Sequence, residues 1–77
     1  MARIDVKRFS ESKNKNQRVH NLISGEYSIV HHGDEKLLQI DTFGSDDRQI
    51  KGKISQSIQL DKEVLEKLVS IYMAKFK

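Results

Sequence analysis

Apolar residues recur at alternate positions in four short runs from residue 18 onward. Alternation over four to eight residues is the pattern of a half-buried strand. The candidates are residues 18–23, 26–32, 36–43 and 53–60, with Ser24-Gly25, Gly33-Asp34 and residues 44–52 between them. Successive strands joined by short turns predict an antiparallel meander.

The apolar spacing becomes helical after Asp61, which stands where a helix N-cap is expected. The apolar positions that follow are Val64, Leu65, Leu68, Ile71, Tyr72 and Phe76. Spacings of three and four put them on one stripe that can pack against the sheet. We therefore predict an α+β fold: a curved four-stranded antiparallel sheet followed by one C-terminal helix that ends near Phe76.

The two strands before the helix each have two different faces. Ile54, Gln56, Ile58 and Leu60 share one face with Leu38 and Ile40, and the outer face carries Leu37, Gln39, Asp41, Phe43, Lys53, Ser55, Ser57 and Gln59. We expect the first set to form the core. The outer face could be exposed to solvent, or it could bind a ligand through hydrogen bonds and stacking on its aromatic ring.

Positive charge is concentrated at the N-terminus. Residues 1–20 hold six basic and two acidic side chains, a net charge of +4, whereas the rest of the chain carries −1. A basic segment on a nearly neutral module suits a polyanion, because neutralised phosphates release counterions. A solvated tail that only aids solubility has the same composition, so both readings stay open.

The chain divides into a basic flexible arm, residues 1–17, and a single domain, residues 18–77. Residues 10–17, SESKNKNQ, contain no apolar side chain and predict a flexible segment. Before them, Ile4 and Val6 alternate with charged residues in the manner of an edge strand.

A chain of 77 residues without cysteine has little capacity to stabilise itself. Folding at this size buries only about 60% of the surface of the unfolded chain, so we expect a homodimer. No apolar run is long enough to cross a bilayer, and Met1-Ala2-Arg3-Ile4-Asp5 lacks the apolar core of a signal peptide. We expect a cytoplasmic protein.

The order of the elements resembles the single-stranded-DNA-binding domain of the transcriptional positive cofactor four family and its small bacterial relatives, over about residues 22–68. The family's basic glycine-containing segment, apolar strand and helix start match Ile50-Lys51-Gly52-Lys53-Ile54 and Ser57-Ile58-Gln59-Leu60-Asp61. The resemblance implies a function in transcription or DNA metabolism, dimerisation through the helix and single strands bound along the sheet and its basic loops.

The resemblance also implies which residues bind. Phosphates would be contacted by Lys36, Arg48, Lys51 and Lys53, with Lys13, Lys15 and Arg18 extending the track. Bases would stack on Tyr27 or Phe43 and accept hydrogen bonds from Gln39, Ser55, Ser57 and Gln59. The helix contact would use Leu65, Leu68, Ile71 and Tyr72. A sheet with one packed and one solvated face shows the same alternation without any ligand.

Other chemistry has less support. His31 and His32 are adjacent, so on a strand they point to opposite faces and cannot hold one metal ion together, and His20 could join only one of them. The order of Asp41, Gln49 and Lys51 is similar to the catalytic motif of a magnesium-dependent nuclease superfamily. The chain is too short to form the folded core of those nucleases. No nucleophile turn or phosphate-binding glycine loop occurs. We expect no enzyme activity, metal, cofactor or small-molecule substrate.

A second class of function fits the same sequence. It is a small protein-interaction or inhibitor module, of phage or mobile-element type, that does not bind nucleic acid. This alternative is based on the small size of the chain, its mixed charge and an expected sheet edge that could accept a partner strand. Salt dependence separates the two classes, because binding to phosphates weakens steeply as salt is added.

Overall fold

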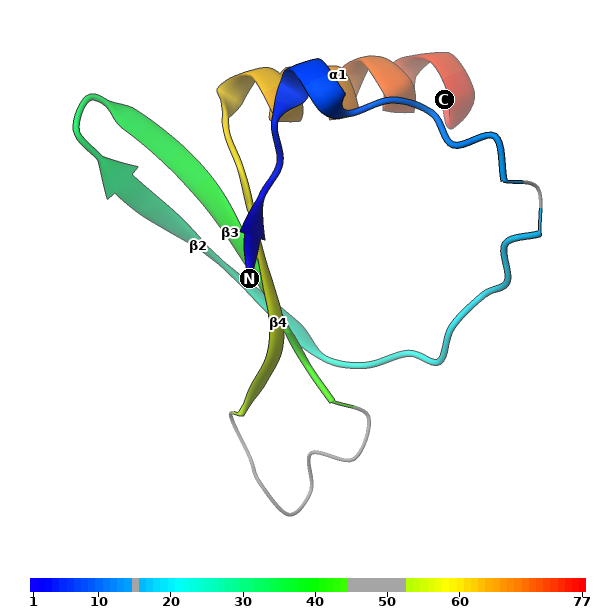
Figure 1. Ribbon diagram of the computed structural model, residues 1–77, viewed down its shortest axis with the longest axis horizontal. Helices are drawn as coiled ribbons and strands as arrows, with labels where there is room; N and C mark the ends of the chain where they lie inside the picture. Colours follow the sequence, from blue (N-terminus) through cyan, green and yellow to red (C-terminus); the bar gives the residue numbers. More distant parts are fainter. Residues whose placement is uncertain (15, 45–52) are drawn as a thin grey trace.

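A single sheet and one helix make up the computed structural model, which describes residues 1–14, 16–44 and 53–77. The elements are β1 (Ala2–Arg3), the 3-10 helix η1 (Val6–Arg8), β2 (Gly25–His32), β3 (Glu35–Phe43), β4 (Ile54–Leu60) and α1 (Lys62–Lys75). The strands lie in the order β1-β4-β3-β2, and α1 starts at the end of β4 and runs away from the β2–β3 hairpin (Figure 1). The prediction of an α+β fold with four strands and a C-terminal helix is confirmed.

Strands β2, β3 and β4 form the predicted antiparallel meander. Their bounds lie within one residue of the predicted ones, because the alternation and the turn residues act locally. The β2–β3 turn is Gly33-Asp34, and Gly33 has a φ of 59°, in the left-handed region that glycine adopts without a steric penalty. These three strands are the frame on which the two faces of the sheet are built.

The remaining strand is not the one predicted. Residues 18–23 form no strand, and Val19 and Leu22 are each 98% exposed. Instead β1, from the predicted arm, runs parallel to β4 with Ala2 opposite Ile58. The sheet is therefore mixed rather than a four-stranded antiparallel meander.

Contacts between distant residues explain why β1 takes that place. The Ile4 N–H donates to the Gln59 carbonyl at 3.1 Å. The Arg3 guanidinium lies 3.2 Å from the Glu35 carboxylate and 3.6 Å from that of Asp61. All these partners are more than thirty residues away along the chain, so local alternation could not reveal them.

Helix α1 begins as predicted but packs differently. The Asp61 carboxylate accepts the Val64 N–H at 2.9 Å, which satisfies a donor that the helix leaves unpaired. Val64 is fully buried and Leu65 is half-buried, but the rest of the apolar stripe is exposed: Leu68, Ile71, Tyr72 and Phe76. The expectation that the stripe packs on the sheet is wrong, because α1 starts at the end of β4 and runs away from the β2–β3 hairpin instead of lying along a face of the sheet (Figure 1).

The first nine residues are part of the fold. Asp5 caps η1 by accepting the Lys7 N–H at 3.0 Å. The Phe9 carbonyl accepts a hydrogen bond from the Lys67 ammonium of α1, which also lies 5.4 Å from the centroid of the Phe9 ring. Residues 10–14 and 16–24 then bow outward before β2 begins (Figure 1). No described helix is both long and apolar enough to pass through a bilayer.

The Asp61 cap gives a testable prediction for stability. Asp61→Ala should lower the free energy of unfolding by about 1 kcal/mol, because the Val64 N–H loses its acceptor. Asp61→Asn keeps the acceptor oxygen and should cost less, so it is the matched control. Urea unfolding at one fixed protein concentration, followed by circular dichroism, measures both. An equal loss in the two variants would assign the effect to the Arg3 ion pair instead of the cap.

Candidate functional site

The register of the meander sorts its side chains into two faces, because directly opposite residues point to the same side. Tyr27, Ile40 and Ile58 form one row, and Ile29, Leu38 and Leu60 form the next. We call this side the apolar face. The other side, the polar face, carries the rows Ser28, Gln39, Gln59 and Glu26, Asp41, Ser57. Leu38, Ile40, Ile58 and Leu60 share one face as predicted. The expectation that this face forms the core is wrong except at Leu60, because Leu38, Ile40 and Ile58 are only half-buried. Leu37, predicted to point outward, is 4% exposed.

Ile54 leaves that predicted face. The pairing of β3 with β4 shifts between Thr42 and Phe43, so that Phe43 lies opposite Ile54 while Thr42 lies opposite Gln56. One extra residue in β4 reverses the alternation beyond it. Ile54 therefore joins Phe43, which was predicted to lie on the outer face but is only 7% exposed.

A hydrogen-bonded cluster occupies the centre of the polar face. One oxygen of the Asp41 carboxylate accepts the Ser57 hydroxyl at 2.6 Å and the Gln39 amide at 3.0 Å. The Gln59 amide in turn donates to the Gln39 side-chain oxygen at 2.9 Å. Asp41 is only 9% exposed. Within the described part of the chain, no buried side-chain nitrogen or oxygen lacks a partner.

This polar cluster uses the groups that the sequence assigned to base recognition. Gln39, Ser57 and Gln59 are brought together as predicted, but they bond to one another and to a carboxylate. Sequence reasoning gave Asp41 no such role. Its signal was available: an acidic residue among alternating polar residues on paired strands needs donors if it is covered.

The other predicted contacts are spread over the molecule. Tyr27 is 77% exposed but lies on the apolar face, and the low exposure of Phe43 leaves its ring no open surface for a base. Lys13, Arg18, Lys36, Lys53 and Ser55 are exposed. The first two lie in the segment before β2, Lys36 lies beside the β2–β3 turn, and Lys53 and Ser55 lie at the opposite end of the sheet. Lys15, Arg48 and Lys51 lie outside the described residues. The structure therefore assembles no continuous basic track from the residues that it describes.

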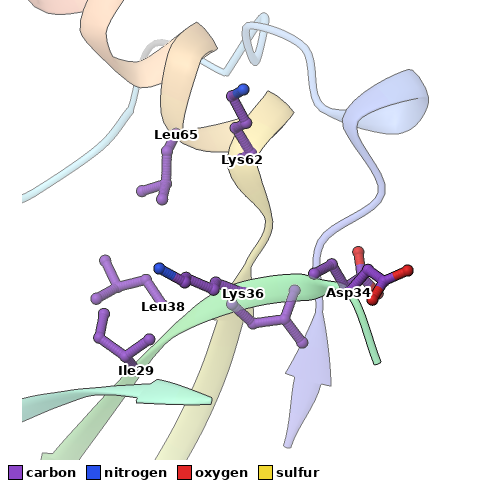
Figure 2. A pocket seen from close by; sticks show the side chains of 8 residues that line it. Ile29, Asp34, Lys36, Leu38, Lys62 and Leu65 are labelled. Atoms are coloured by element: carbon purple, nitrogen blue, oxygen red, sulfur yellow. The ribbon is translucent and has the colours of Figure 1, made fainter. Parts of the chain in front are cut away.

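An apolar groove that sequence reasoning missed lies between α1 and the β2–β3 hairpin. It has a volume of about 640 Å³. Figure 2 shows Leu65 of α1 pointing toward Leu38 of β3, with Ile29 of β2 beyond it. The rim carries charges of both signs, from Asp34, Glu35, Lys36 and Lys62. The groove continues the apolar face up to the helix.

One ionisable group among the described residues has a pKa shifted by its contacts. Asp5 has its pKa lowered, chiefly by the backbone N–H of Lys7 that it accepts and further by Arg8, and this reflects its capping of η1. Among the described residues, no group of three or more His, Asp or Glu side chains could hold a metal ion.

Comparison with known proteins adds no assignment. No family model, curated protein sequence or solved structure matches the chain. The function is therefore argued from the two faces and the edges of the sheet.

The polar cluster can be tested by a matched pair of serine substitutions on β4. Ser57→Ala should lower the free energy of unfolding by about 1.5–3 kcal/mol, because it removes a hydrogen bond to a largely buried carboxylate. Ser55→Ala, at an exposed position two residues away, should change it by less than about 0.5 kcal/mol. Denaturant unfolding measures both. Equal effects would show that the cluster does not contribute to stability.

Proposed function

We propose that this chain is a protein-interaction module that binds another polypeptide along β2 and the apolar face. One observation carries the proposal: every residue of β2 except the half-buried Val30 is exposed. These include Tyr27 at 77% and Ile29 at 54% exposure. A strand that borders a sheet and exposes apolar side chains is a surface for association.

The apolar groove and the helix extend this surface. Leu65 borders the groove next to Ile29 and Leu38, and Leu68 and Tyr72 stay 37% and 54% exposed further along α1. Contiguous apolar surface of this kind is uncommon on monomeric proteins and marks interaction sites. Main-chain hydrogen bonds from an edge strand would supply affinity, and a groove beside it would supply selectivity.

The composition of the polar face favours a polypeptide partner over a nucleic acid. Its central group is a carboxylate, which repels phosphate, and the neighbouring amides and hydroxyl are already bonded to one another or to Asp41. The ring of Phe43 is covered. A strand of DNA laid on this face would gain few contacts and would have to disrupt the polar cluster.

A second candidate, single-stranded nucleic acid, is supported by the basic N-terminal segment. Lys13 and Arg18 are exposed on the part of the chain that bows away from the sheet, together with polar Asn14, Asn16 and Gln17. Such a segment could follow a phosphate backbone without using the sheet. It leaves the apolar face unexplained, so it is the weaker candidate.

The protein-interaction proposal predicts where a photo-crosslinker will react. A benzophenone-bearing phenylalanine in place of Tyr27, in cells that make the protein, should form protease-sensitive and nuclease-resistant adducts upon illumination. The same group in place of Phe76, which is 76% exposed at the end of α1, is the matched control and should give far fewer. Ile29→Lys should suppress the Tyr27 adducts. Nuclease-sensitive adducts, or equal yields at the two sites, would contradict the proposal.

The nucleic-acid candidate predicts salt-dependent binding of a fluorescent single-stranded oligonucleotide. The logarithm of the binding constant should fall linearly with the logarithm of salt, with a slope of about −0.7 per phosphate contacted. Replacing Lys13 and Arg18 by glutamate should make the slope shallower, whereas Lys36→Glu, on the rim of the apolar groove, should not. No binding at low salt would exclude this candidate.

A further inference from the structure

We infer that β2 pairs antiparallel with β2 of a second copy of this chain, so that two sheets join into one across a two-fold axis. The inference rests on the proposed function and names its partner. It differs from dimerisation through α1, because the contact is made by the edge of the sheet.

The hydrogen-bonding pattern shows which backbone groups of β2 face outward. The Phe43 N–H donates to the Ser24 carbonyl at 3.1 Å, and Gly25 lies opposite Thr42. Since bonding alternates along an antiparallel pair, the even-numbered residues of β2 bond to β3. The odd-numbered residues Tyr27, Ile29 and His31 therefore direct N–H and C=O groups away from the sheet.

This edge lacks the features that prevent strand pairing. β2 is eight residues long, contains no proline, and has Glu26 as its only residue of fixed charge. Natural edge strands are usually shortened, broken by proline or protected by lysine. The opposite edge, β1, is two residues long and carries Arg3. The contrast assigns the pairing to β2.

Symmetry restricts the register. A two-fold axis perpendicular to the sheet keeps each side chain on its own face, so a residue can oppose only a residue of the same parity. An axis through Ser28 pairs residues 25–31, and an axis through Ile29 pairs as many, residues 26–32. Only the axis through Ser28 puts Tyr27 opposite the partner's Ile29. Aromatic and β-branched side chains make favourable cross-strand pairs, and these two are the most exposed apolar side chains of β2. The apolar faces of both copies then become continuous.

The exposed area is large enough for such a dimer. The chain exposes 7287 Å², whereas a compact monomer of its mass exposes roughly 4,800 Å². The excess is roughly 2,500 Å², and about a third of it equals the 800 Å² that each partner buries in a standard stable interface. Segments that bow outward also contribute to this excess (Figure 1).

A single-cysteine variant tests the register directly, because the chain has no cysteine of its own. In the proposed dimer Ser28 and the partner's Ser28 are a directly opposed, non-hydrogen-bonded pair with Cα atoms about 4.5 Å apart. That distance permits a disulfide. Under mild oxidation Ser28→Cys should run mostly as a covalent dimer on a non-reducing gel. Ser70→Cys, at an exposed position on α1, should stay mostly monomeric.

A proline substitution provides an independent test. The Ile29 N–H points away from β3, so Ile29→Pro removes a donor only from the outer edge, where proline is tolerated. It should shift the protein to monomer in sedimentation equilibrium, and Ile29→Val, which keeps the donor, should remain dimeric. Circular dichroism verifies folding, and if Ile29→Pro does not fold, the Ser28→Cys result decides alone.

The outcomes separate this inference from the proposed function. Crosslinking by Ser70→Cys but not by Ser28→Cys would overturn it in favour of a helix-mediated dimer. A wild-type chain that stays monomeric at all concentrations, while the Tyr27 photo-crosslinker joins a different polypeptide, would overturn it and leave the proposed function standing. If the photo-crosslinker at Tyr27 forms no adduct with any polypeptide, both the inference and the proposed function are contradicted.

Discussion

The shortage of apolar cover governs this structure. Helix α1 has 14 residues and is about 21 Å long at 1.5 Å per residue, whereas the nine residues of β3 extend about 30 Å. A helix of that length that runs away from the β2–β3 hairpin leaves most of the sheet uncovered (Figure 1). The buried apolar side chains within the described residues are therefore few: Leu37, Phe43, Leu60 and Val64. The apolar face stays open for the same reason.

The polar face combines hydrogen bonds with burial, since Asp41 and, on the same side of β3, Leu37 are both buried. Asp41, Gln39, Ser57 and Gln59 connect β3 to β4 in one network, and a satisfied network of this kind holds its members in one arrangement. Arg3 performs a related task at the edge, since its ion pairs with Glu35 and Asp61 link β1 to β3 and to the start of α1. Such exposed pairs contribute little energy individually, so their main effect is to fix where the N-terminal strand lies.

The two faces therefore have different roles. The polar face is closed by its own contacts, whereas the apolar face, the groove below α1 and the edge of β2 remain open to another chain. An association that joins two β2 edges would turn the exposed edge of the monomer into the centre of a larger sheet. It would also leave both helices and both N-terminal segments outside the contact, available for other partners.

The sequence by itself determined the elements whose signals are local. The alternation in residues 26–43 and 53–60, the Gly33-Asp34 turn and the Asp61 cap predicted three strands and a helix, because each depends on neighbours a few residues apart. Only the tertiary structure decided that Ala2–Arg3 and not residues 18–23 completes the sheet, that the register shift beside Phe43 moves Ile54, and that Asp41 organises the polar face. These depend on contacts between residues far apart in the chain, and one extra residue in a strand reverses every face beyond it.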